Sequence, residues 1–410
     1  MNIRAVLDKM IAAHASDLHL KAGTPPVVRV DGVLYTLDEP PPSAPELRDA
    51  VDQLLNDEQR LYFSTHSEID FAFGVSGLAR FRANCFMQRG TPAMALRHVP
   101  VEVPSIEDLM LPPVVRELAF SPRGLVLVTG RTGSGKSTTL AAMIDAINRV
   151  TTRNVITVED PIEFLHRDRL SFIHQREVGL DTRSFHDGLK YVLRQDPDIV
   201  LVGEIRDLDT MSTTLMAADT GHLVLSTLHT TDVVQTLQRV ISFYPPHQHD
   251  ELRLSMASNL RAVISQRLVP RRDGAGRVPA VEVMVSTPTV REYIMSPERT
   301  PMLHSVIAEG TTQYGMQTFD QSLMTLLREG FISEDEALKN ANNPNELALK
   351  LKGIDASSDR TWQSIEGAAP VAEPLPVGEP AASGGTAGGA TGGGAPRRAT
   401  PAPPLEGFLN

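Results

Sequence analysis

The stretch Gly130-Arg131-Thr132-Gly133-Ser134-Gly135-Lys136-Ser137 matches the pattern G-x-x-x-x-G-K-[ST] and decides how the sequence around it is interpreted. The apolar run Leu125–Thr129 predicts a strand before it, and the periodic segment Thr138–Ile147 predicts a helix after it. Glycines let backbone N–H groups turn inward around phosphates, and the helix N-terminus adds partial positive charge. We therefore expect every residue from Gly130 to Thr138 to bind ATP. Lys136 would contact the β- and γ-phosphates, and the Ser137 hydroxyl would contact Mg²⁺.

Short apolar runs alternate with predicted helices through the middle of the chain. Continuous apolar runs of this length are typical of parallel strands that are covered on both faces. They predict an α/β core, and the runs are Leu125–Thr129, Val155–Val158, Ile199–Val202 and Leu223–Thr227.

A carboxylate follows one of these runs, in Asp198-Ile199-Val200-Leu201-Val202-Gly203-Glu204. In a doubly wound sheet the carboxyl ends of the strands gather at the ligand crevice. Glu204 is therefore a candidate to support the Mg²⁺ site or to position water. The alternative is a solvated residue that opens the next helix.

Three more carboxylates follow the run Val155–Val158, namely Glu159, Asp160 and Glu163. ATP hydrolysis needs a group that orients or deprotonates the attacking water, and a carboxylate near the γ-phosphate can do so. The residues alone do not select one of the three. Helix capping by Asp160 is an equal alternative.

His222 and His229 bracket the predicted strand Leu223–Leu228, so each end of the strand carries an imidazole. A lone histidine is more often a structural residue than a functional one. The functional alternative is that the two contact or sense the γ-phosphate.

The first hundred residues have a different pattern. An amphipathic helix at Ile3–Ala13 precedes short strands separated by turn residues, including the dipeptide Asp31-Gly32, which suits a hairpin. The remaining predictions here are a helix near Ala44–Leu55 and the strands Val27–Val30, Glu68–Val75, Ala79–Gln88 and Ala93–Val99.

We accordingly expect four parts in the chain. These are an α+β domain over residues 1–100, a proline-bearing hinge over 101–113, the ATPase domain over 114–353, and a disordered tail over 354–410 that is rich in Pro, Gly and Ala.

Composition limits the possible partners. The net charge of −11 argues against broad binding to nucleic acid, and no run of about 18 apolar residues predicts a membrane span. The single cysteine, Cys85, excludes an intrachain disulfide and is expected to be a buried filler on a strand. These features predict an intracellular protein.

Taken together, the four motifs of the central domain resemble those of the secretion-superfamily ATPases, and specifically the PilT/PilU family of type IV pilus retraction ATPases. Gly130–Ser137 resembles the Walker A motif, Val158–Phe164 the Asp box, Asp198–Glu204 Walker B, and Thr220–His229 the His box. The resemblance also covers Ser16–Leu20 and Gly315–Gln321, and so spans residues 1–352.

The resemblance implies a RecA-like core preceded by a PAS-like domain, in an ATPase whose cofactors are ATP and Mg²⁺. It implies that Glu163 is the general base, that Glu204 supports Mg²⁺, and that His222 and His229 form the His-box pair. It further implies that N-terminal arginines close on the phosphates; Arg80, Arg82 and Arg97 lie on matching strands.

The family resemblance also implies partners and a location. It implies a cytoplasmic homohexamer that is held at the inner membrane through a pilus platform protein. This assembly would retract type IV pili and power twitching motility.

Motifs within the family point in two directions. Arg176–Thr182 and Gln266–Pro270 resemble the PilU branch, whereas Asp207-Leu208 resembles PilT, and Thr289–Ile294 matches the retraction motif of PilT only loosely. One alternative is therefore an accessory ATPase that depends on a second retraction ATPase. Two others are a nucleic-acid translocase, against which the acidic balance counts, and a nucleotide-dependent scaffold with little hydrolysis.

Overall fold

The computed structural model describes residues 1–30, 32–100 and 102–352, so the predicted tail, residues 354–410, lies outside the described residues. The described chain falls into two compact units, Met1–His98 and a second that begins at Val99.

The first unit is built on a sheet whose strand order among the described residues is β3-β2-β1-β6-β5-β4. Strand β1 pairs antiparallel with β2 and β6, and β4 pairs antiparallel with β5. The strands are β1 (Asp17–Lys21), β2 (Thr24–Val30), β3 (Val33–Thr36), β4 (Glu68–Val75), β5 (Ala79–Gln88) and β6 (Thr91–Val99). The helices are α1 (Ile3–Ala12), α2 (Ala44–Leu54) and α3 (Asp57–His66).

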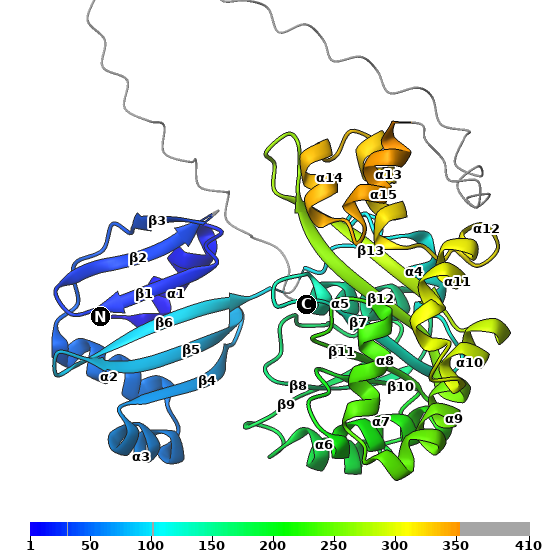
Figure 1. The fold of residues 1–410 in the computed structure, drawn as a ribbon. Coiled ribbons are helices and arrows are strands. Elements are labelled where there is room, and N and C mark those ends of the chain that lie inside the picture. The colour runs from blue at the N-terminus through cyan, green and yellow to red at the C-terminus, as the bar shows by residue number, and fades with distance from the viewer. Residues whose placement is uncertain (31, 101, 353–410) are drawn as a thin grey trace, which may run out of the picture. The chain divides into compact units, whose positions relative to one another are not determined.

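One face of this sheet is covered by α1 and α2, as Figure 1 shows. Leu7 of α1 and Leu47 of α2 are buried in one cluster with Leu18 and Phe81 of the sheet. Cys85 of β5 is buried in the same cluster, and burial raises the pKa of its thiol to about 12. The expectation that Cys85 fills space on a strand is confirmed.

The second unit is built on a larger sheet with the order β13-β12-β7-β11-β10-β8-β9 among the described residues. Every pairing from β12 to β9 is parallel, and β13 runs antiparallel to β12. The strands are β7 (Gly124–Thr129), β8 (Asn154–Glu159), β9 (Phe172–Glu177), β10 (Ile199–Val202), β11 (Leu223–Leu228), β12 (Leu260–Pro270) and β13 (Arg277–Val285).

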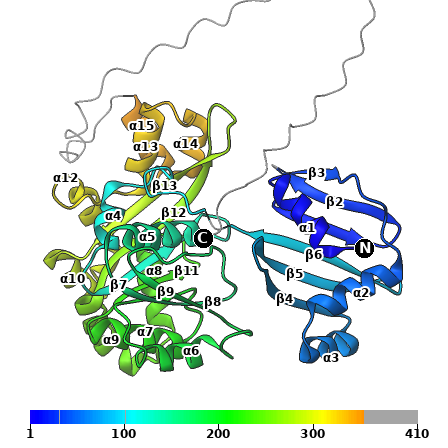
Figure 2. The ribbon, with the colours of Figure 1, turned by 180° about the vertical axis from the view of Figure 1, so that it is seen from behind.

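Helices cover both faces of the parallel sheet, which explains why its central strands are apolar throughout. On β7, Leu125 and Leu127 pack with α6 to α11, whereas Val126 and Val128 pack with α4 and α5. Figures 1 and 2 show these two layers from opposite sides. The helices are α4 (Pro113–Ala119), α5 (Lys136–Val150), α6 (Phe185–Val192), α7 (Leu208–Asp219), α8 (Val233–Ser242), α9 (His249–Asn259), α10 (Pro288–Met295) and α11 (Leu303–Glu309).

The last helices lie against the ends of β12 and β13. Phe319 and Leu323 are buried with Val269 and Val278 of those strands. These helices are α12 (Thr311–Tyr314), α13 (Phe319–Arg328), α14 (Glu334–Asn340) and α15 (Pro344–Leu351). None of the helices in the described ranges is both long enough and apolar enough to cross a bilayer.

The predicted core strands are all present, and most extend a residue or two beyond their apolar run. The helix predicted from Thr138 begins earlier, at Lys136, because the P-loop itself winds directly into the first turn. The expected hairpin is also present, since β2 and β3 pair antiparallel and Val30 pairs with Val33.

Candidate nucleotide-binding site

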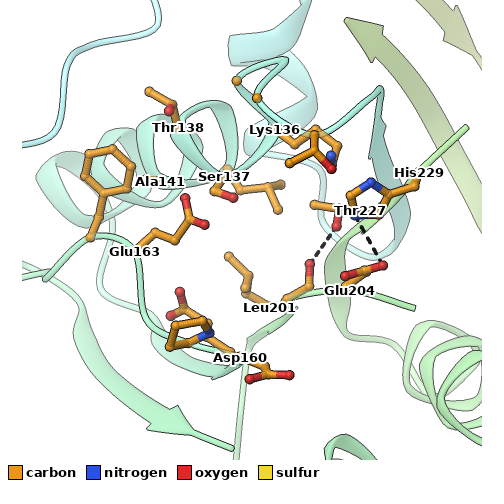
Figure 3. A pocket seen from close by; sticks show the side chains of 18 of the residues that line it. Lys136, Ser137, Thr138, Ala141, Asp160, Glu163, Leu201, Glu204, Thr227 and His229 are labelled. Atoms are coloured by element: carbon orange, nitrogen blue, oxygen red, sulfur yellow. Dashed lines mark hydrogen bonds and ion pairs between the residues drawn. The ribbon is translucent and has the colours of Figure 1, made fainter. Parts of the chain in front are cut away.

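A pocket of about 560 Å³ lies in the second unit, where β7, β8, β10 and β11 end. Its lining includes the P-loop, Glu163, Glu204 and His229. In Figure 3, Glu163 lies on one side of the pocket, Glu204 and His229 lie on the other, and Ser137 lies between them. The parallel sheet therefore collects residues from four separate segments at one edge.

The glycines of the P-loop meet two different steric demands. A Cβ added to Gly130, whose φ is +148°, would lie 2.4 Å from Ser134 Oγ and 2.5 Å from the carbonyl oxygen of Gln266. Gly135 adopts φ +93° directly before α5 begins at Lys136. Side chains at either position would strain the loop or clash with it, so the tight approach to the helix N-terminus requires glycine.

The Lys136 ammonium lies at the centre of this loop and is buried. Its Nζ donates to the carbonyl oxygens of Gly130 at 2.9 Å and Arg131 at 3.3 Å. Burial lowers the pKa of Lys136, and the nearby carboxylates of Glu204 and Glu163 oppose that shift. A desolvated cation beside two anions gains most from a ligand that brings further negative charge, such as a phosphate.

Glu204 lies two residues beyond the end of β10 and is held by two partners. Its Oε2 accepts from Arg206 Nη2 at 2.8 Å and Nε at 2.9 Å, and its Oε1 lies 3.2 Å from His229 Nε2. Arg206 also pairs with Asp160 at 3.5 Å, and these contacts raise its pKa. Because α7 begins only at Leu208, with Asp207 as its N-cap, Glu204 does not open that helix.

The segment after β8 carries the three remaining carboxylates. Glu159 is bonded by Thr157 Oγ1 at 2.6 Å and Gln175 Nε2 at 3.1 Å, and burial raises its pKa. Asp160 and Glu163 are exposed residues that line the pocket. The alternative role of Asp160 as a helix cap does not apply, because residues 160–171 form an irregular loop that leads into β9.

The structure separates the two histidines. His229 follows the carboxyl end of β11 and lines the pocket, but His222 precedes the opposite end of the same strand. The His222 ring contacts the carbonyl oxygen of Ala217 at 3.0 Å and Thr220 Oγ1 at 3.1 Å. A strand of six residues spans about 20 Å, so the structure does not bring His222 to this pocket.

The three predicted arginines belong to the first unit. Arg80 and Arg82 alternate along β5 with the buried residues Phe81 and Ala83, so they share the face of the sheet that points away from the core. Arg97 of β6 follows buried Leu96 and donates to Asp17 Oδ1 at 2.8 Å.

Ser137 and Glu204 are the residues predicted to support Mg²⁺. The first turn of α5 supplies the Ser137 hydroxyl, and both residues line the same pocket. Mg²⁺ prefers oxygen ligands and is commonly bound by one or two protein oxygens together with substrate phosphates. The hydroxyl and the carboxylate therefore fit this ion.

Two features of the site were missing from the sequence prediction. Arg206 lies two residues after Glu204, and that short spacing was the available signal. Leu268 and Arg277 also line the pocket, from β12 and β13. Their participation depends on the pairing of β12 with β7, which no local pattern shows.

Similarity to known proteins identifies the family of this chain. The model of the family described as Type II/IV secretion system protein matches residues 2–338. The chain belongs to this family. It is 39% identical over 370 residues to the type IV pilus ATPase PilU of Pseudomonas aeruginosa, covering 90% of this chain and 96% of the relative. It is 43% identical over 344 residues to the type IV pilus retraction ATPase PilT of the same organism, covering 84% and 99%.

Solved structures agree with this family assignment. A crystal structure of the pilus retraction motor PilT with bound ADP has a TM-score of 0.79 and 41% identity, covering 85% of this chain and 99% of that one. The Legionella pneumophila ATPase DotB has a TM-score of 0.72 and 27% identity, covering 86% and 96%. The predicted resemblance to PilT and PilU and the predicted fold class are thereby confirmed.

Proposed function

We propose that this protein is an ATP-hydrolysing motor that powers type IV pilus retraction and twitching motility. The observation that carries the proposal is the single pocket that combines Lys136 of the P-loop with the carboxylates of Glu163 and Glu204. It occurs in a chain that is 43% identical to a named retraction ATPase over 84% of its length.

The P-loop, Glu163 and His229 each have a role in this proposal. Backbone N–H groups of residues 130–138 and the Lys136 ammonium bind the β- and γ-phosphates. Glu163 accepts a proton from the water whose oxygen attacks the γ-phosphorus. The bond between the γ-phosphorus and the oxygen that bridges it to the β-phosphate breaks, and the products are ADP and inorganic phosphate. His229, 3.2 Å from Glu204, holds that carboxylate and lies where it can respond to the γ-phosphate.

Mg²⁺ bound with the nucleotide would supply positive charge to the phosphate oxygens. Ser137 and Glu204 are the residues proposed to hold it. Arg206 donates twice to one oxygen of Glu204 and so orients the carboxylate whose other oxygen faces His229.

Coupling to mechanical work is proposed to involve the rest of the molecule. Arg80, Arg82 and Arg97 of the N-terminal domain, residues 1–100, would approach the phosphates when the hinge at 101–113 moves, stabilise charge in the transition state and so link hydrolysis to motion. His222, as the second His-box residue, would act outside the pocket of its own chain. We propose a cytoplasmic homohexamer that is attached to the inner membrane through a pilus platform protein.

The test combines an ATPase assay on the full chain with a twitching assay. A strain that lacks this protein should regain twitching with the intact protein but not with Lys136→Ala. The substitution should abolish turnover and weaken nucleotide binding, because it removes the buried cation. Arg153→Met, which removes an ion pair with Asp198 away from the pocket, is the matched control and should behave like the intact protein. Normal twitching with Lys136→Ala would refute the motor.

A second candidate is an accessory ATPase that works beside a principal one, because Arg176–Thr182 and Gln266–Pro270 resemble the PilU branch of the family. The PilU relative aligns over 370 residues, compared with 344 for PilT. A double-deletion strain separates the two roles. An autonomous motor restores twitching in that strain by itself, whereas an accessory ATPase restores it only when the principal ATPase is also supplied.

A further inference from the structure

The loop of residues 160–171 carries Glu163, yet it has neither helix nor strand to hold it. Contacts from other elements hold its backbone instead. Glu177 Oε2 accepts from Ile162 N at 3.2 Å, and the carbonyl oxygen of Pro100 accepts from Leu165 N at 3.0 Å. Two side-chain amides, Gln175 of β9 and Asn148 of α5, each make two further hydrogen bonds to the loop backbone. We infer that Gln175 and Asn148 are positioning residues that set the place of Glu163 relative to the bound phosphates. The inference rests on the proposed role of Glu163 as the general base.

Gln175 holds the part of the loop next to Glu163. Its Nε2 donates to the carbonyl oxygen of Phe164 at 2.8 Å, and its Oε1 accepts from the backbone N–H of His166 at 2.8 Å. The same Nε2 donates to Glu159 Oε1 at 3.1 Å. Both ends of one amide are therefore used within three residues of Glu163, and β9 supplies a fixed base for it through its pairing with β8.

Asn148 holds the returning part of the loop. Its Nδ2 donates to the carbonyl oxygen of Arg167 at 2.7 Å, and its Oδ1 accepts from the N–H of Arg169 at 3.1 Å. Its own carbonyl oxygen accepts from the N–H of Leu170 at 3.0 Å. The residue is 1% exposed, so these contacts are shielded from competing water.

The position of Asn148 gives these contacts their meaning. It lies on α5, the same helix that begins at Lys136 and Ser137 of the phosphate loop. The helix is a rigid element, so the amide ties the loop of Glu163 to the groups that bind the phosphates. Gln175 ties it to Glu159 at the end of β8. A misplacement of about 1 Å in a reacting group can lower a rate roughly 100-fold, so the two amides are placed where small losses of order matter.

The test measures turnover and nucleotide affinity separately in the full chain. Gln175→Met and Asn148→Leu remove the amides and keep side chains of similar length. Each should lower kcat about 10- to 100-fold, while the Kd for ADP stays within about twofold of the unmodified protein. Asn154→Leu is the matched control, because Asn154 donates to the carbonyl oxygens of Gln195 and Asp196 at the other end of β8. It should leave kcat unchanged at any temperature below its unfolding transition.

A double substitution distinguishes positioning from a general structural role. If Gln175 acts through Glu163, then Gln175→Met added to Glu163→Gln should cause no further loss of turnover. A further tenfold loss of turnover in the double variant would overturn the inference. So would a loss of kcat in Asn154→Leu as large as the loss in Gln175→Met or Asn148→Leu. The proposed function fails differently: if Glu163→Gln by itself turns over ATP like the unmodified protein, Glu163 is not the base.

Discussion

The two walls of the pocket are built in different ways. The strand-end wall consists of Glu204, Arg206 and His229, which follow the buried central strands β10 and β11. The loop wall consists of residues 160–171 with Glu163, and it lies beside the outermost strand, β9. The first wall takes its geometry from backbone pairing of the sheet, whereas the second takes it mainly from individual side-chain hydrogen bonds, with two backbone contacts beside them.

This difference teaches where the site is robust. Gly203 N donates to the carbonyl oxygen of Val158 at 2.8 Å, and Ile205 N donates to that of Thr227 at 3.1 Å, so the backbone on both sides of Glu204 remains part of the sheet. A single side-chain substitution cannot remove those contacts. On the loop wall most supporting contacts end in the side chains of Gln175, Asn148 and Glu177, so single substitutions can remove them.

The largest expected effect separates the two carboxylates. Glu163→Gln should lower kcat about 1,000-fold, because an amide does not accept the proton of the attacking water, and should leave ADP affinity unchanged. Glu204→Gln should lower kcat less, about 10- to 100-fold, and should raise the Mg²⁺ concentration needed for half-maximal turnover. Steady-state assays across a Mg²⁺ titration measure both. Reversed magnitudes would show that the roles of the two walls were assigned the wrong way round.

The loop wall should lose stability in acid. Burial lowers the pKa of His166 to about 4, from an ordinary value of 6.5. Between these values the unfolded chain binds a proton that the folded chain does not, so stability falls as pH falls from 6.5 to 4, by roughly 3 kcal/mol in total. Denaturant unfolding of the unmodified protein and His166→Gln measures this, because the stability difference between them should narrow as pH falls. A difference that does not change with pH would contradict the shift.

Glu282, which contacts the start of α8 beyond the strand-end wall, should give folding stability the opposite dependence on pH. Glu282 of β13 accepts from Val233 N at 2.8 Å, at the start of α8, and burial raises its pKa to about 7. Between pH 4.5 and 7 the folded chain holds a proton that the unfolded chain has lost, so stability falls as pH rises, again by roughly 3 kcal/mol. Glu282→Gln should remove this dependence. Identical pH profiles for the two proteins would show that Glu282 titrates normally.

The smallest expected effect concerns Arg206, which links the two walls through Glu204 and Asp160. Its side chain is 57% exposed, so solvent screens these ion pairs. Arg206→Met should lower kcat only about three- to tenfold, with a smaller effect at high salt. Arg153→Met removes a pair of similar exposure and should change nothing in the same assay. A loss as large as that of Glu163→Gln would mean that Arg206 contacts the reacting phosphate itself.

The difference between the walls also explains how far the sequence could be interpreted. The strands β7, β10 and β11 were predictable because a parallel strand buried on both faces must be apolar throughout. The P-loop was predictable because its glycines answer steric demands that only glycine meets. Strand β9 was missed because it lies at the edge of the sheet, and its residues, from Phe172 to Glu177, do not alternate between apolar and polar types.

The candidate site shows the same division. Lys136, Ser137, Glu163 and Glu204 were predicted from motifs and do line one pocket. The pairing of His222 with His229 does not hold within this pocket, because a strand directs its two ends to opposite edges of the sheet. No local pattern could have shown that Gln175 and Asn148 bond the loop of Glu163, because β8 separates Asn148 from the loop and Gln175 reaches it only through the pairing of β9 with β8.

The sequence by itself determined the phosphate loop, the apolar core strands with the carboxylates that follow them, and the family. Each of these depends on residue types at short, fixed spacing. Only the tertiary structure decided which charged groups meet. Glu204 lies next to His229, and the charge of Lys136 interacts with those of Glu163 and Glu204, because strands distant along the chain pair side by side and end at one edge. Contacts of this kind depend on the register and order of the sheet, which are properties of the whole fold.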